Sequence, residues 1–150
     1  MQIVYTTSSD PHFIKLCAAL DEDLNHTIGS QKQADQYSQY NTLESIKEVV
    51  LALEDGEPIG CGAFKHYEKG IAEIKRVFVR PGHRGKGISK QIINALEEKA
   101  RMQGYQKLIL ETGKRLVVAA KLYKQMGFVI IDNYGPYKNL KESICMEKQL

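Results

Sequence analysis

Residues 77–89 read VFVRPGHRGKGIS, an apolar run that leads through a glycine-rich turn into a helical pattern. The first N–H groups of a helix have no partner within it, and they lie at the positive end of the helix dipole. Glycines such as Gly85 and Gly87 let a turn take unusual backbone angles and let the backbone approach a ligand closely. The stretch therefore predicts a diphosphate site formed largely by backbone N–H groups.

Known nucleotide-binding motifs fit this turn less well. A P-loop needs Ser or Thr after its Gly-Lys pair, whereas Lys86 is followed by Gly87. A dinucleotide fold places its glycines after a first strand within a βαβ unit, but this turn follows three consecutive predicted strands. Gly85 and Gly87 could instead serve only to tighten the strand-to-helix connection. The run of basic residues between positions 75 and 90, with no acidic residue among them, favours the anion site.

The flanking sequence predicts an α/β sandwich. Strands are expected at 2–6, 48–53, 58–66, 71–79, 108–110, 128–132 and 143–148, and helices from Asp10-Pro11 onward, at 86–103 and at 114–126. Residues 25–41 are ambiguous, either a second short helix or a cover. We expect a single domain over residues 1–150, with a mixed, mostly antiparallel central sheet of about seven strands and helices on both faces.

The apolar residues of the predicted strand 71–79 change parity part-way along it. Ala72 and Ile74 share one face in an alternating strand, whereas Val77 and Val79 fall on the other. Either the strand is buried on both faces, or its phase slips by one residue near position 75. Such a slip is a β-bulge, a feature often found beside active sites, and we prefer this interpretation.

Three segments together resemble the Gcn5-related N-acetyltransferase (GNAT) superfamily, in order and spacing, over about residues 58–132. They are residues 84–89 (RGKGIS), 110–113 (LETG) and 120–128 (AKLYKQMGF). The first resembles the family's motif A, Arg or Gln followed by x-x-Gly-x-Gly/Ala, with Ser89 in place of the usual final Gly or Ala. The resemblance implies a GNAT-like fold and an N-acetyltransferase that moves an acetyl group from acetyl-CoA to a primary amine by direct attack in a ternary complex.

The resemblance also implies how CoA is bound. Backbone of Val77, Phe78 and Val79 would pair with the pantetheine arm, and Arg84, Gly85, Lys86, Gly87, Ile88 and Ser89 would hold the pyrophosphate. In the family, a bulge in this strand opens the gap where the acyl chain lies. The family often has Asn, or Gln-Pro, before the later helix; residues 115–118 (RLVV) have neither, so no side-chain contact from Leu116 to pantetheine is expected.

Acyl transfer to an amine needs a group that takes the amine proton and a group that protonates the leaving sulfur. By resemblance, Tyr123 is the acid, although a tyrosine at helical spacing can also simply pack on the sheet. Glu73 resembles the glutamate that some family members use as a base, its pKa raised by burial. The alternatives are a surface Glu73 paired with Lys75 or a neighbouring strand, Glu111 as the base, or a chain of water molecules.

Composition limits the function classes. A net charge of +3 does not by itself favour nucleic acid, and no stretch approaches the length of a membrane span. The three cysteines, Cys17, Cys61 and Cys145, are odd in number, and no signal peptide is seen, so a reduced, cytoplasmic protein is expected. No His and Cys spacing suggests a metal. The sequence leaves a homodimer open.

The acceptor is expected to enter opposite CoA, over the first helix and the loops. Asp21, Glu22 and Asp23 form an acidic cluster there, and Tyr37, Tyr40, Tyr134 and Tyr137 supply aromatic rings. A cationic amine, either a small metabolite or a peptide lysine or N-terminus, would suit such a surface. The alternative functions are a non-catalytic acyl-CoA-binding or regulatory module on the same fold, and a nucleic-acid binder that uses the basic run.

Overall fold

The computed structural model describes residues 1–28, 43 and 45–150. In this part of the chain seven strands form one sheet, in the order β1-β2-β3-β4-β5-β7-β6. The strands are β1 (Gln2–Thr6), β2 (Ile46–Glu54), β3 (Glu57–Glu68), β4 (Ile71–Val79), β5 (Lys107–Gly113), β6 (Val129–Ile131) and β7 (Ser143–Gln149). The helices are α1 (Pro11–Ile28), α3 (Ile88–Met102) and α4 (Val117–Gln125), with 3-10 turns η2 (Pro81–His83) and η3 (Gly135–Tyr137).

The sheet is mixed, as the sequence predicts: β4 and β5 are parallel, and the other neighbouring pairs are antiparallel. Helix α4 begins at Val117 rather than near Lys114, because residues 114–116 form a turn after β5. Helix α1 continues into the segment at 25–41 whose structure the sequence left open. Tyr37 and Tyr40, which were expected near the acceptor, lie outside the described residues.

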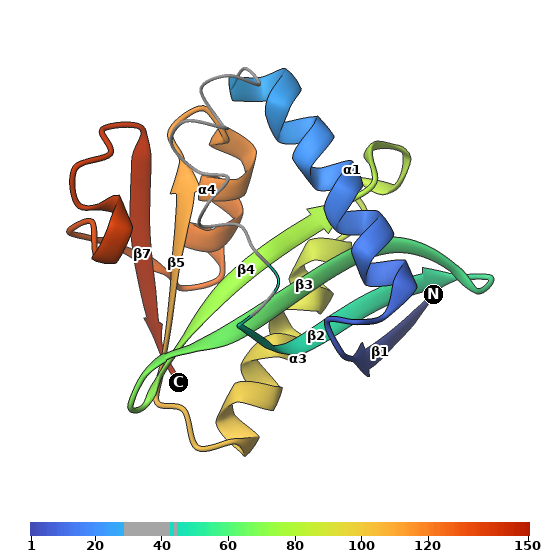
Figure 1. Cartoon of the computed structure of the whole chain (residues 1–150), viewed down its shortest axis with the longest axis horizontal. Helices are drawn as coiled ribbons and strands as arrows, with labels where there is room; N and C mark the ends of the chain where they lie inside the picture. The colour runs from blue at the N-terminus through green and yellow to red at the C-terminus, as the bar shows by residue number, and fades with distance from the viewer. Residues whose placement is uncertain (29–42, 44) are drawn as a thin grey trace.

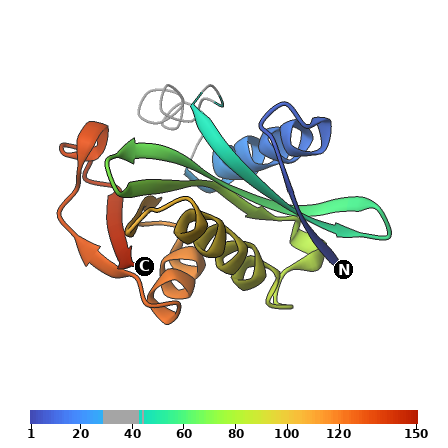
Figure 2. The ribbon, with the colours of Figure 1, turned by 90° about the horizontal axis from the view of Figure 1, so that it is seen from below.

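Helix α1 covers one face of the sheet, and α3 and α4 cover the other (Figures 1 and 2). Successive side chains of a strand point to opposite faces of the sheet, so the strands contribute apolar residues to a core on each face. Val49 and Leu51 of β2 pack in the cluster that contains Phe13 and Leu16 of α1. Their neighbour Val50 packs in the opposite cluster with α3. Phe13 and Leu16 therefore lie on the face of α1 that packs against the sheet.

The predicted β-bulge in β4 is confirmed. Cys61 of β3 lies opposite Phe78, whereas Ala63 lies opposite Lys75, so Gly62 alone faces two residues of β4. Arg76, one of these two, has a φ of 61°, which is unusual for a residue with a side chain. The extra residue explains the change of parity in the apolar pattern of this strand.

Strands β4 and β5 pair over only a short distance and then separate. Residues 71–73 pair with residues 107–109. Beyond this point β4 continues against β3, and β5 continues against β7 as far as Gly113. The divergence of the two strands is visible in Figure 1. It opens the middle of the sheet at the level of the bulge, and the candidate site lies there.

Candidate active site

A cavity of about 150 Å³ lies between the diverging strands. Among the described residues, its walls are residues 74–77 of β4, 110–113 of β5, residues 114–116, 119 and 123 in and before α4, Leu20 and Leu24 of α1, and Glu142. The cavity therefore contacts helices from both faces of the sheet. Two ligands that approach from opposite faces could meet within it.

Strand alternation divides the cavity into two halves. On the side of α4, here called the α4 half, Val77, Leu110 and Tyr123 belong to the apolar cluster that contains α3. On the side of α1, the α1 half, Lys75 and Glu111 leave β4 and β5 on the face opposite Ile74 and Leu110. One half is thus largely apolar, and the other carries charged groups.

Tyr123 lies in the wall of the α4 half and is only 7% exposed. Its position follows from the way α4 ends. Gly127 has a φ of 96°, its N–H donates to the carbonyl of Lys124, and the N–H of Phe128 donates to the carbonyl of Tyr123. This is a Schellman ending, for which glycine is the preferred residue. It folds Phe128 against Tyr123, with ring centroids 5.6 Å apart.

The environment of Tyr123 keeps its hydroxyl protonated. Burial, and secondarily the negative charge of Glu111, raise the pKa of Tyr123 above its ordinary value of 10. The sequence offered a catalytic acid and a packing residue as alternatives for Tyr123. In the structure it both packs on the sheet side of α4 and lines the cavity.

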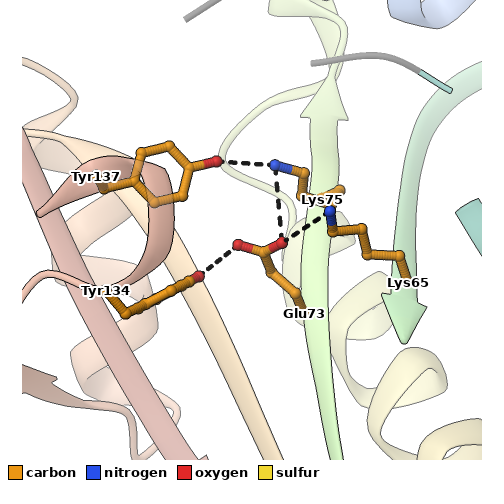
Figure 3. A network of polar contacts seen from close by, with 5 residues as sticks. All are labelled: Lys65, Glu73, Lys75, Tyr134 and Tyr137. Carbon is orange, nitrogen blue, oxygen red and sulfur yellow. Dashed lines mark hydrogen bonds and ion pairs between the residues drawn. The ribbon is translucent and has the colours of Figure 1, made fainter. Parts of the chain in front are cut away.

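Glu73 lies at the centre of a buried polar network rather than in the cavity wall formed by the described residues (Figure 3). The hydroxyl of Tyr134 donates a hydrogen bond to its Oε2 atom. Its Oε1 atom lies 3.7 Å from Nζ of Lys65 and 3.9 Å from Nζ of Lys75. One alternative for Glu73 was a surface residue paired with Lys75 or a neighbouring strand, and Glu73 lies near a lysine of β4 and a lysine of β3. The expected surface position is wrong, because Glu73 is only 2% exposed.

Glu111 occupies the cavity wall itself. The hydroxyl of Ser143, on the adjacent strand β7, donates to its Oε2 atom over 2.6 Å. Burial raises the pKa of Glu111. Its neighbour across the gap, Lys75, donates to the hydroxyl of Tyr137 over 3.0 Å, and burial lowers the pKa of Lys75. Glu111 and Lys75 therefore give the α1 half an acidic and a basic group, both in a poorly hydrated environment.

The glycine-rich turn has the shape that a bound phosphate requires. Gly85 and Gly87 have φ values of 80° and 78°, and a Cβ atom on either would meet nothing within 4 Å. Gly87 directly precedes α3, whose first turn has no side-chain cap. Helix N–H groups and open space therefore lie together at this turn. The residues present fit a pyrophosphate.

The side chains of the turn differ in their contacts and burial. The guanidinium of Arg84 donates to the carbonyl of Val79 over 2.8 Å and lies 3.1 Å from Asp23. Ile88 turns its side chain into the core, so only its backbone can face the turn. Ser89 is half-buried. Phosphate binding here would depend mainly on backbone N–H groups, as the sequence predicts.

The backbone of residues 77–79 forms the last part of β4, beyond the bulge. Phe78 and Val79 pair with Cys61 and Gly60 of β3 on one edge. In the described pairing, the other edge of β4 leaves β5 after Glu73. This edge leads from the cavity to the glycine-rich turn, so it fits the pantetheine arm of CoA.

The acidic cluster at the end of α1 is largely neutralised within the chain. Asp21 pairs with Arg76 over 2.6 Å, and Asp23 pairs with Arg84. Glu22 is exposed. Two of the three charges that suggested a cationic acceptor are thus already engaged by arginines.

Among the described residues, no three His, Cys, Asp or Glu side chains are grouped so that they could hold a metal ion. No helix in the described part of the chain combines the length and the apolar character needed to cross a membrane.

Residues 15–128 match the model of the Acetyltransferase (GNAT) family. The chain belongs to this family. A curated relative, the IAA acetyltransferase of Azospirillum brasilense, is 37% identical over 102 residues, which cover 67% of each protein. A Klebsiella pneumoniae crystal structure, provisionally assigned as an acyl-CoA N-acyltransferase, matches with a TM-score of 0.83 and 33% identity, covering 99% of this chain and 97% of that one. A GNAT acetyltransferase of Elizabethkingia anophelis, solved with acetyl-CoA bound, is 26% identical, with a TM-score of 0.72 over 99% of this chain and 97% of its own.

This GNAT protein is an acetyl-CoA-dependent N-acetyltransferase. The family, the fold class and the enzyme class predicted from the sequence are thereby confirmed. The sequence reading did not place Lys75 or Ser143 at the site. Lys75 could have been noticed, because it lies two residues from Glu73 and so shares its face of the strand. Ser143 carries no comparable sequence signal, since its contact with Glu111 depends on the pairing of β5 with β7.

Proposed function

We propose that this GNAT enzyme acetylates a primary amine in the cavity between β4 and β5, with Tyr123 as the acid and Glu111 as the base. The observation that carries the proposal is that these two side chains line one cavity from opposite halves. The backbone of residues 77–79 and the turn at 84–89 would hold acetyl-CoA. Acetyl-CoA supplies the acetyl group as a reactive thioester.

Glu111 is preferred to Glu73 as the base for a geometric reason. A base must reach the amine directly or through one water molecule, and Glu111 lies in the cavity wall. Its pKa, raised by burial, is closer to the pH at which a base works well. The carboxylate of Glu73 is already engaged by Tyr134, with two lysines near its other oxygen. We assign Glu73 the role of positioning Lys75.

Tyr123 suits the acid's part because its environment opposes ionisation. A raised pKa means that the hydroxyl carries its proton at neutral pH. The proton on Tyr123 Oη can pass to the departing sulfur while Glu111 takes a proton from the attacking nitrogen. The two transfers balance for an uncharged amine: one proton leaves the nitrogen, one reaches the thiol, and exchange with solvent restores both side chains. An acceptor that arrives as an ammonium first loses one further proton to solvent.

The test is a panel of amines incubated with acetyl-CoA and the wild-type chain, with free thiol and the mass of the acetylated amine as readouts. The proposal expects stoichiometric thiol and N-acetyl product for at least one amine. Acetyl-CoA that raises the melting temperature without any transfer would instead support the binding-module alternative. Salt-sensitive binding to DNA or RNA that free CoA does not displace would support the nucleic-acid alternative.

A further inference from the structure

The α1 half of the cavity presents the ammonium of Lys75 and the carboxylate of Glu111 to an incoming acceptor. Lys75 and Glu111 both lie in its wall, one on each of the two diverging strands. They influence each other electrostatically, since Glu111 is among the charges that act on Lys75. A pair of opposite charges on facing walls is complementary to a ligand that also carries both charges.

Lys75 is fixed in place by the buried network around it. Its side chain is 10% exposed, and its ammonium donates to Tyr137. The carboxylate of Glu73 lies 3.9 Å away, which is beyond hydrogen-bond distance. An ammonium has three N–H groups, so Lys75 keeps donor capacity for a ligand in the cavity while Glu73 and Tyr137 hold it in position (Figure 3).

Helix α1 adds an apolar surface to this half. Leu20 and Leu24 of α1 close the cavity opposite the strands. The guanidinium of Arg76, which also lies in the wall, is paired with Asp21. An acceptor would therefore meet a lysine, a glutamate and a leucine surface.

We propose that the acceptor is an amino acid with an apolar side chain. Its carboxylate is bound by Lys75, its amine faces Glu111, and its side chain lies against Leu20 and Leu24. This inference rests on the proposed function and narrows its acceptor. It replaces the cationic amine expected from Asp21, Glu22 and Asp23, because the charge that faces the cavity at Lys75 is positive.

The experiment compares amino acids with the same molecules lacking the carboxylate. L-leucine is paired with 3-methylbutylamine, and L-phenylalanine with 2-phenylethylamine. For each pair, kcat/KM is measured with the wild type, Lys75→Met, Lys75→Arg and Lys65→Met. Lys65 is the matched control, because it lies near the same oxygen of Glu73 but is not among the described residues of the cavity wall.

The readout is the ratio of kcat/KM for the acid to that for the amine. This ratio is compared between variants, so the different basicity of the two amines cancels. Since a hydrogen bond to a charged group is lost, Lys75→Met is expected to lower the ratio about 10-fold to 100-fold. Lys75→Arg keeps a positive charge and should retain most of the preference. Lys65→Met should leave the ratio at its wild-type value.

The result that overturns the inference is distinct from the failure of the proposed function. If wild type acetylates the decarboxylated amines as well as the amino acids, or if Lys75→Met and Lys65→Met change the ratio equally, the carboxylate is not bound by Lys75. Absence of reaction with all four compounds, while other amines of the panel are acetylated, also overturns it. Loss of thiol release with every amine would instead refute the proposed function itself. Melting curves of each variant report whether it is folded.

Discussion

The guanidinium of Arg76 lies 2.6 Å from the carboxylate of Asp21, so the bulged residue of β4 is tied to helix α1. The carbonyl of the same residue accepts a hydrogen bond from the thiol of Cys61 over 3.3 Å. Arg76 therefore holds a positive φ while both its side chain and its backbone are engaged by neighbouring elements. These contacts fix the bulge that opens the cavity.

Asp21→Asn is expected to lower the free energy of unfolding by about 1 kcal/mol, since the pair is partly open to water on the Asp21 side while the arginine is 8% exposed. Denaturant unfolding measures the change. Glu22→Gln, at the neighbouring exposed position, is the control and should stay within about 0.5 kcal/mol of wild type. Equal effects of the two substitutions would contradict the role given to the Arg76–Asp21 pair.

Glu111→Gln is expected to remove the acidic limb of the pH profile of kcat/KM. A base acts when deprotonated, and burial raises the pKa of Glu111, so wild-type activity should fall as the pH drops through this raised value. Tyr123, whose pKa is also raised, should keep its proton and produce no falling limb near neutral pH. Measurement of kcat/KM against pH tests both points.

The comparison variant for that profile is Glu73→Gln. If Glu73 were the base, the acidic limb would persist in Glu111→Gln and disappear in Glu73→Gln, which is the reverse of our expectation. Lys75 and Glu73 are the charged groups that act on the Glu111 carboxyl, and both remain in the Glu111 variant.

Gly87→Ala is expected to weaken acetyl-CoA binding as well as stability. A side chain at a φ of 78° costs roughly 1–2 kcal/mol, and the added methyl group would enter the open space of the glycine-rich turn. Gly104→Ala is a matched control at the other end of α3, with a φ of 88° and equally open surroundings. Both variants should lose similar stability, but calorimetric titration should show a higher Kd for acetyl-CoA only with Gly87→Ala.

Gly62→Ala is expected to destabilise the fold by about 1–3 kcal/mol through overpacking. A Cβ atom at this position would lie 2.6 Å from Cγ2 of Ile92 and 3.0 Å from Cδ1 of Leu96. Gly82→Ala, where a Cβ atom meets nothing within 4 Å, should be nearly neutral. Chemical denaturation of both variants checks this, and a neutral Gly62→Ala would mean that α3 packs less closely against β3 than the structure shows.

The sequence predicted those features whose determinants are local. Strand 71–79 has the bounds that its apolar pattern indicates, and its change of parity identified the bulge. The glycines at 85 and 87 predicted the turn, because a positive φ is required there.

What escaped prediction depends on contacts between distant segments. The sequence favoured Glu73 as the base, with Glu111 as an alternative, and only the separation of β4 from β5 places Glu111 in the cavity wall. The bond from Tyr134 to Glu73 spans 61 positions. The pairing of Asp21 with Arg76, which removes the apparent acidic surface, spans 55. No periodic pattern encodes such contacts.

The most direct test of the account is thiol release by Tyr123→Phe, measured at saturating acetyl-CoA and a responsive amine. The substitution keeps the ring packed on Phe128 and removes only the hydroxyl proton, so kcat should fall about 100-fold or more, while the Kd of acetyl-CoA stays unchanged. A variant that binds acetyl-CoA normally and turns over at the wild-type rate would contradict the claim that Tyr123 supplies the proton in this cavity.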